Sequence, residues 1–194
     1  MTSVEYVGHV ISSTGLSMSR EKIQRIQNFP RPTTKKDIQS FLGMVGWFKD
    51  HIPNFSQVSR GLRALVQHGD APSFQREWTS ETFESFENLK NMVNLCPHLY
   101  FINDDDEVHL ETDASQSGIG AILYVIREGK KYPIQWFSAT FNKQQQNWRT
   151  QEQECYGIIA AVKEFHHYLS HIHFTFSWYR RCIQIYTLPE RMMQ

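Results

Sequence analysis

Residues 107–121 read EVHLETDASQSGIGA, and this stretch decides the fold prediction. Val108–Thr112 predicts a buried strand that delivers Asp113 at its end, and the small residues that follow let the chain turn into a second strand at 119–126. A carboxylate at the rigid end of a strand is well placed to bind a metal ion. Asp is also common in ordinary β-turns, so this stretch alone leaves both interpretations of Asp113 open.

Regular elements continue on the C-terminal side of this hairpin. The expected elements are a turn at 127–130, a strand at 133–137, a helix at 148–169 and a strand at 174–178. The helix carries an apolar stripe formed by Cys155, Ile158, Ile159, Val162 and Phe165. Strands combined with a long amphipathic helix indicate an α/β domain.

Two acidic residues on the predicted helix, Glu152 and Glu154, are further site candidates. They are two positions apart, so their side chains point in different directions. Glu154 borders Cys155 and Ile158 of the apolar stripe, which makes it the better candidate to face the core. A solvated helical face is the structural alternative. Hard divalent cations such as Mg²⁺ take oxygen ligands, and two-metal hydrolysis of a phosphodiester uses several carboxylates.

The N-terminal half is predicted to be mainly helical. After a strand at 4–12 and a turn at 13–15, Ser19 is expected to cap a short helix. Thr34 with Asp37 resembles a capping box for a second helix, and Ser56 is expected to begin a third. Beyond a linker that contains Gly and Pro, Thr79 begins a helix with one apolar side, formed by Phe83, Phe86, Leu89 and Val93.

The bulk composition is that of a globular protein, with 40% hydrophobic and 21% charged residues. The formal net charge is zero, so overall charge gives no support to nucleic-acid binding. The three cysteines show no metal-ligand spacing, and their odd number without a signal peptide favours free thiols in an intracellular compartment, cytoplasmic or nuclear. No apolar run is long enough to span a membrane. The sequence opens within a predicted strand, which indicates a fragment.

A series of short motifs runs through the chain. In the N-terminal half they are Tyr6–Ser12 with Gly15, Lys22-Ile23, Phe29–Pro32, Phe41–Met44, Trp47-Phe48 and Ile52–Ser56. In the C-terminal half they are Trp78 with Phe83, Phe86 and Leu89-Lys90, then Thr112–Ser115, Gly118–Ala121, Pro133-Ile134, Ser138 and Gln153-Glu154. Over residues 4–176 the chain therefore resembles the reverse transcriptase–RNase H polyprotein of gypsy-type LTR retrotransposons and their endogenous relatives. Any one motif is weak, but their common order makes the resemblance specific.

The resemblance implies an α/β (α+β) fold, in which a small helical thumb remnant is followed by an RNase H-like mixed β-sheet with packed helices. The sheet is expected to be incomplete at the C-terminus, after its fourth strand. The implied domains are the end of the palm with a primer-grip-like strand (1–16), a helical thumb-like segment (17–68), a linker (69–78), a partial RNase H-like domain (79–179) and a divergent tail (180–194).

The resemblance also implies which residues are catalytic. The first catalytic Asp of the family falls on Asp113 and its helical Glu on Glu154, and both would bind Mg²⁺ or Mn²⁺. The third acid of the family lies in a Thr-Asp-His motif, where this sequence has Ser177-Trp178-Tyr179-Arg180. The paired aspartates of the polymerase are absent, and Asp104–Asp106 lies in the wrong part of the chain to replace them. The fragment is therefore not expected to polymerise DNA alone.

Residues of the primer-grip-like strand and basic residues of the thumb-like segment are candidates for nucleic-acid contact. They are Gly8, His9, Lys22, Arg25, Lys35 and Lys36, and the implied partner is an RNA–DNA hybrid or a template–primer duplex. Ordinary solvated lysines are the alternative, and His9 is equally well a strand residue without a ligand. Trp47 and Phe48 are expected in the core.

Two functions compete at this point. The first is metal-dependent hydrolysis of the RNA strand of an RNA–DNA hybrid, impaired by loss of the third acid. The second is a catalytically inactive nucleic-acid-binding or interaction relic, with the remainder of a reverse transcriptase as a possible partner. An adaptor unrelated to retroelements would require the ordered motifs to be a coincidence.

Overall fold

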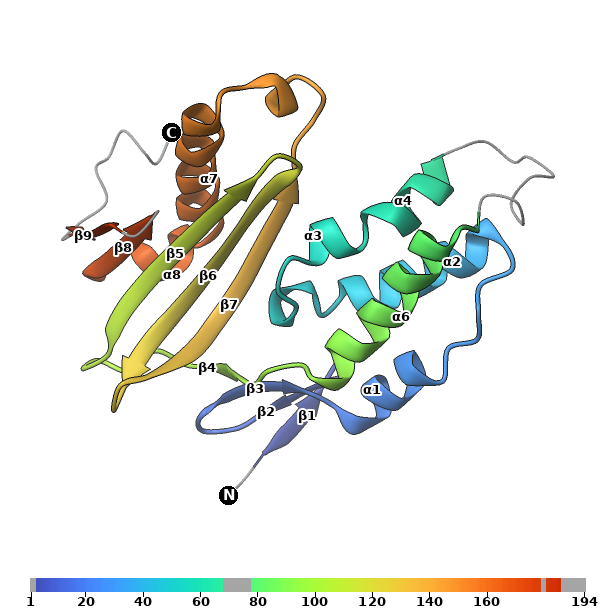
Figure 1. The fold of residues 1–194 in the computed structure, drawn as a ribbon. Coiled ribbons are helices and arrows are strands. Elements are labelled where there is room, and N and C mark those ends of the chain that lie inside the picture. The colour runs from blue at the N-terminus through green and yellow to red at the C-terminus, as the bar shows by residue number, and fades with distance from the viewer. Residues whose placement is uncertain (1–2, 68–77, 179–180, 186–194) are drawn as a thin grey trace. The chain divides into compact units, whose positions relative to one another are not determined.

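The structure, a computed structural model, describes residues 3–67, 78–178 and 181–185 (Figure 1). The chain divides after His98 into two compact units, which we call the N-terminal unit (1–98) and the C-terminal unit (99–194). Among the described residues, no helix combines the length and apolar character needed to cross a membrane.

The N-terminal unit begins with three short antiparallel strands, β1 (Val4–Tyr6), β2 (His9–Ile11) and β3 (Gly15–Met18). The prediction of one strand over 4–12 was wrong, because the chain reverses at Val7 (φ 49°) and Gly8 (φ 84°). Two consecutive positive φ values make the two-residue turn that matches the twist of a hairpin. Val7 is β-branched and rarely adopts a positive φ, which is why the local sequence favoured an unbroken strand.

Helices make up the rest of the N-terminal unit. They are α1 (Arg20–Gln27), α2 (Lys35–Gly46), α3 (Phe55–Val58), α4 (Arg60–Gln67) and α6 (Ser80–Asn94), with a 3₁₀ turn η1 (Lys49–His51). Ser19 caps α1, Thr34 and Asp37 form the predicted capping box of α2, and Thr79 caps α6. The expected third helix is two short ones, and Asn54 rather than Ser56 precedes the first of them. The predicted linker 69–78 lies outside the described residues, apart from Trp78.

The core of the N-terminal unit includes α6. Phe86, Leu89 and Val93 of this helix are fully buried in the same cluster as Ile26 of α1 and Phe41 of α2. Phe83 is 40% exposed instead. The guanidinium carbon of Arg31 lies 5.5 Å from the centroid of the Phe83 ring and 5.3 Å from that of the Trp78 ring. The helix that follows the expected linker therefore packs with the helices that precede it.

The C-terminal unit holds a five-stranded sheet in the order β7-β6-β5-β8-β9 (Figure 1). Its strands are β5 (Glu107–Ser115), β6 (Gly118–Arg127), β7 (Lys130–Thr140), β8 (Phe174–Trp178) and β9 (Arg181–Ile185), preceded by the short β4 (Leu99–Tyr100). β5 pairs parallel with β8, and the other pairs are antiparallel. The mixed α/β architecture is as predicted. The sheet does not stop after four strands, however, because residues 181–185 of the expected divergent tail supply the fifth.

Helix α7 (Thr150–Glu164) packs against β5 and β6, and is preceded by the 3₁₀ turn η2 (Gln145–Asn147) and followed by α8 (His166–Leu169). The core between this helix and the sheet contains Leu110, Leu123, Ala161 and Phe165. The predicted apolar stripe was partly wrong, since Cys155 and Ile159 are exposed. The residues of α7 that are buried are Gln153, Glu154, Gly157, Ala161 and Val162.

Candidate active site and nucleic-acid interface

Asp113 lies within β5, two residues before the strand ends at Ser115, and it pairs with Gly120 of β6. Val108, Leu110 and Thr112 are buried on the side of the sheet that α7 covers. Because side chains alternate along a strand, Asp113 shares the opposite face with His109 and Glu111. Its side chain is exposed, so its carboxylate is accessible to solvent and to a ligand.

Glu154 is buried, at 7% exposure, on the face of α7 that packs on the sheet. Glu152 has a different task, because its carboxylate accepts a hydrogen bond from the Arg149 N–H at 2.8 Å and so caps the helix. Glu154 is thus the inward acid of the two, as the sequence predicted. The stated reason was only partly right, since Ile158 packs against the core but Cys155 is exposed.

Gly157 determines how closely α7 approaches the sheet near these acids. A Cβ at this position would lie 3.2 Å from Cγ2 of Ile119, which is tighter than most side chains tolerate. Ile119 pairs with Ala114, the residue after Asp113. Glu154 is one turn before Gly157, and α7 begins at the end of the sheet where β5 passes into β6 (Figure 1). The turn of helix that carries Glu154 and the part of β5 that carries Asp113 are therefore at the same end of the sheet, but Asp113 lies on the face opposite to α7, so the two carboxylates do not share one face.

The acids present do not fit a two-ion metal centre. Within residues 3–67, 78–178 and 181–185, no group of three His, Cys, Asp or Glu side chains could hold a metal ion. On β8, Ser177 pairs with Glu111, which places a hydroxyl rather than a carboxylate on the Asp113 face. Tyr179 and Arg180, which stand with Ser177 and Trp178 where the resemblance places the motif of the third acid, lie outside the described residues. A two-ion mechanism uses more carboxylates than Asp113 and Glu154 provide.

Gly8 and Lys22 pack closely against each other at the tip of the β1–β2 hairpin. A Cβ on Gly8 would lie 2.8 Å from Cγ and Cε of Lys22, so the aliphatic stem of Lys22 rests directly on this glycine. The Gly8 carbonyl also accepts a hydrogen bond from the Ser19 N–H at 2.9 Å, which ties the hairpin tip to the start of α1. Arg25 follows one turn later on α1 and is exposed. The structure thus brings Gly8, Lys22 and Arg25 to one region.

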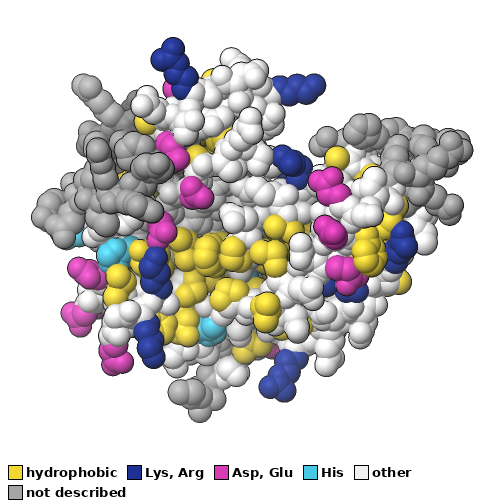
Figure 2. Space-filling view, in the orientation of Figure 1, with side chains coloured by type: hydrophobic (Ala, Val, Ile, Leu, Met, Phe, Trp, Pro, Cys, Tyr) yellow, Lys and Arg dark blue, Asp and Glu magenta, His cyan; other side chains and the backbone are white. Residues whose placement is uncertain are grey.

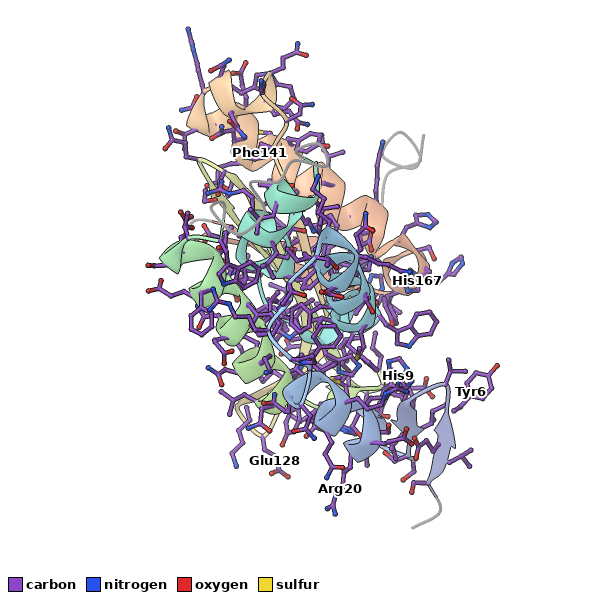
Figure 3. The ribbon with its side chains drawn as sticks, turned by 90° about the vertical axis from the view of Figure 1, so that its right-hand side faces the viewer. Tyr6, His9, Arg20, Glu128, Phe141 and His167 are labelled. Atoms are coloured by element: carbon purple, nitrogen blue, oxygen red, sulfur yellow. The ribbon has the colours of Figure 1, made fainter. Side chains whose placement is uncertain are left out.

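His9 is half-buried and packs against aromatic rings at η1. Its ring centroid lies 4.9 Å from that of Phe48 and 5.5 Å from that of His51. Burial lowers the pKa of His9, although the nearby Asp50 acts in the opposite direction. A neutral, packed imidazole is a poor phosphate ligand. Figure 3 shows His9 beside the body of the unit and Tyr6, which is 68% exposed, extending away from it.

Two aromatic residues next to His9 differ in exposure. Phe48 is buried as predicted, but Trp47 is 58% exposed, so the expectation that it belongs to the core was wrong. Trp47 directly follows the last residue of α2 and its ring centroid lies 6.4 Å from that of His9. An exposed indole beside the hairpin offers a flat apolar surface to a sugar or base.

The remaining basic candidates, Lys35 and Lys36, lie in the first turn of α2, where Lys35 is half-buried and Lys36 exposed. On the face shown in Figure 2, Lys and Arg side chains are interspersed with Asp and Glu side chains and do not gather in one patch. Contact with nucleic acid on this face would therefore depend on a few individual Lys and Arg side chains and not on a broad region of positive charge.

Comparison with known proteins agrees with this fold. Residues 78–176 match the family model described as the RNase H-like domain found in reverse transcriptase. The chain therefore belongs to the family of RNase H-like domains found in reverse transcriptases. Its relatives include the Transposon Tf2-3 and Tf2-4 polyproteins of Schizosaccharomyces pombe, each 30% identical over 169 residues and 87% of this chain. The chain spans 12% of the length of these polyproteins.

Solved structures extend the likeness of this family member to its N-terminal unit. A foamy viral protease-reverse transcriptase in complex with dsDNA has a TM-score of 0.73 and 23% identity, covering 89% of this chain and 36% of the viral one. The same viral protein in complex with RNA/DNA hybrid has a TM-score of 0.69 over 84% of this chain and 22% of its own. At this identity the likeness shows the fold alone. The family model begins just before α6, whereas the compact C-terminal unit begins after it.

Proposed function

We propose that this chain is a reverse transcriptase segment that binds an RNA–DNA hybrid or template–primer duplex, and that hydrolysis of the RNA strand is strongly reduced in it. The observation that carries the binding proposal is the hairpin tip, where Lys22 lies across Gly8. Cations held in place this way contact phosphates and give affinity without reading sequence. An A-form-like hybrid is recognised largely through its shape and backbone.

Three further points support duplex binding. Arg25 is exposed on the same helix as Lys22. Tyr6 of β1 and Trp47, whose ring lies beside that of His9 in β2, are exposed aromatic side chains, at 68% and 58%. The foamy viral proteins of similar fold were solved with dsDNA and with RNA/DNA hybrid. We extend the partner proposal to the remainder of a reverse transcriptase, and the site of action to an intracellular compartment.

Reduced hydrolysis follows from the number of acids. Asp113 and Glu154 are the carboxylates that the family resemblance assigns to catalysis and to Mg²⁺ or Mn²⁺ binding, but they lie on opposite faces of the sheet. Two-ion phosphodiester hydrolysis depends on a larger set of carboxylates, and these two alone do not supply it. We therefore expect residual cleavage orders of magnitude below that of an RNase H with an intact acid set.

Binding is tested by fluorescence anisotropy with a labelled RNA–DNA hybrid over a range of salt concentrations. The variant Lys22→Gln with Arg25→Gln removes two phosphate contacts, so the slope of log affinity against log salt should fall by roughly 1 to 2. Lys130→Gln, which removes one positive charge at the start of β7, is the control and should leave the slope unchanged. Equal slopes for all three proteins would contradict the assignment of Lys22 and Arg25.

Catalysis is tested by cleavage of the same hybrid in Mg²⁺ or Mn²⁺. Weak cleavage should disappear in Asp113→Asn and persist in Asp105→Asn, which removes an exposed acid elsewhere in the same unit. Tyr179→Asp restores an acid at the position of the family motif and should increase the rate. Cleavage that Asp113→Asn leaves unaffected would contradict the site.

A non-catalytic nucleic-acid-binding relic is the second candidate function. It is favoured by the absence of any three-ligand metal group among the described residues. No cleavage by the native chain or by Tyr179→Asp, together with salt-dependent hybrid binding, would support this candidate over the weak nuclease.

A further inference from the structure

His51 is a buried imidazole that the proposed function does not use. It ends η1 and is 1% exposed, packed beside the rings of His9 of β2 and of Phe48. Its Nδ1 lies 3.2 Å from the carbonyl oxygen of Pro97. Since a carbonyl only accepts hydrogen bonds, Nδ1 carries the proton and donates it, and Nε2 is left as the unprotonated nitrogen. Nε2 is buried without a hydrogen-bond partner among the described residues.

The same short segment, residues 96–98, is held by two more side-chain contacts. The Cys96 thiol donates to the carbonyl oxygen of His51 at 3.7 Å. The Thr14 hydroxyl lies 3.5 Å from Nε2 of His98. Residues 96–98 are the last of the N-terminal unit before Leu99 begins the next unit. Contacts from η1 and from the β2–β3 turn thus fasten the end of the segment that leaves this unit.

We propose that His9, His51 and His98 form an acid-sensitive latch, which holds residues 96–98 on the N-terminal unit and releases them when the imidazoles gain protons. A proton on Nε2 of His51 would place a charge in a buried position with no acceptor, and buried unpaired charge is strongly unfavourable. Opening the latch exposes this nitrogen to water.

The titratable groups around His51 favour the neutral latch. His9 and His98 each repel a proton on His51 and lower its pKa. Asp50, next to His51 in sequence, attracts a proton to His9. Cys96 does not titrate in this range, because burial raises its pKa to about 12. Lys49 completes the charged residues of η1.

The direction of the pH effect follows from these groups. Burial is the main cause that lowers the pKa of His51 from 6.5 to about 4 in the closed latch. Between these two values the open form binds more protons than the closed form, so the closed latch loses stability as pH falls from 6.5 to 4. Above pH 6.5 its stability is complete.

Hydrogen–deuterium exchange of the full chain at pH 7 and pH 5, corrected for the intrinsic exchange rate, tests the latch. The opening equilibrium constant of residues 96–98 should rise roughly 20-fold at pH 5, while that of the α2 core at 38–45 stays unchanged. His51→Gln keeps an amide donor but cannot gain a proton, so its opening should not depend on pH. His171→Gln, at an exposed histidine of the other unit, should behave as the native chain.

Two results would overturn the proposal. One is the same pH dependence in His51→Gln as in the native chain, and the other is joint opening of 96–98 and α2. If His51→Gln does not fold, nitrogen-detected NMR titration of the native chain decides. The latch requires the Nδ1–H tautomer and a depressed pKa for His51, and an Nε2–H tautomer or an ordinary pKa contradicts it.

Discussion

Gly8 serves the hairpin in two ways that no other residue can combine. It supplies a positive φ at the second turn position, and its lack of a side chain leaves room for the stem of Lys22. The first role fixes the reversal between β1 and β2, and the second fixes the path of a lysine that we assign to phosphate contact. Local conformation and the proposed interface therefore depend on the same residue.

Gly8→Ala should destabilise the N-terminal unit by about 1–2 kcal/mol, because an L side chain at positive φ is strained and its Cβ meets Lys22. Gly43→Ala is the matched control. Gly43 lies inside α2 with open space around its Cβ position, so alanine there should stabilise by about 0.5–1 kcal/mol. Urea denaturation measures both changes, and a neutral Gly8→Ala would show that the turn adapts without cost.

At the residue scale, the sequence predicted features that depend on near neighbours along the chain. Ser19 and the Thr34–Asp37 box were predictable because their hydrogen bonds close within three residues. Glu154 was placed correctly, but partly through an exposed neighbour, since the close approach of Gly157 to Ile119 is tertiary information. The exposure of Trp47 was missed for the same reason. An aromatic residue at the end of an apolar stripe gives no local sign of which side it faces.

At the scale of elements, the strands and helices of the C-terminal unit were largely predictable, but their edges were not. Glu128 and Gly129 also form a turn of two positive-φ residues, at the predicted position between β6 and β7. β9 was missed because its pairing depends on the vacant edge of β8, which local sequence does not reveal. The tail residues 181–185 thus turn β8 from an edge strand into an inner strand.

Removal of β9 should therefore expose a strand edge. A chain that ends at Arg180 leaves the outer backbone groups of β8 unpaired, and an open edge promotes pairing with other chains. We expect this variant to form oligomers or aggregates at concentrations where a chain ending at Thr187 stays monomeric. Light scattering coupled to size exclusion measures the difference. Equal monomer content in both truncations would show that β9 does not protect the edge.

At the scale of the whole molecule, α6 is the element at which two ways of dividing the chain disagree. The family model includes it with the RNase H-like domain, whereas its apolar face is buried in the core of the N-terminal unit. Sequence resemblance follows ancestry and order along the chain. Packing follows the location of complementary apolar surface, and for α6 that surface lies on α1, α3 and α4.

Two fragments distinguish these boundaries. A fragment of residues 78–194 keeps α6 but loses its packing partners, so Phe86, Leu89 and Val93 would face water. We expect its α6 amides to exchange as fast as an unfolded chain, because an isolated helix of this length is marginal in water. A fragment of residues 99–194 should keep the protected amides of β5 and β6. Strong protection of α6 in the longer fragment would place the helix in the C-terminal unit instead.

The parallel ladder between β5 and β8 also determines the order in which the sheet is completed during synthesis. β5, β6 and β7 follow one another and pair through short turns, so their meander forms as soon as it leaves the ribosome. The second edge of β5 stays open until α7 and β8 have been made, because β8 comes from much later in the chain. Contacts between residues so far apart in the sequence slow folding and prolong the exposure of unpaired backbone groups. Nascent chains should therefore be most vulnerable to chaperone capture or misassembly in the interval between translation of β7 and of β8.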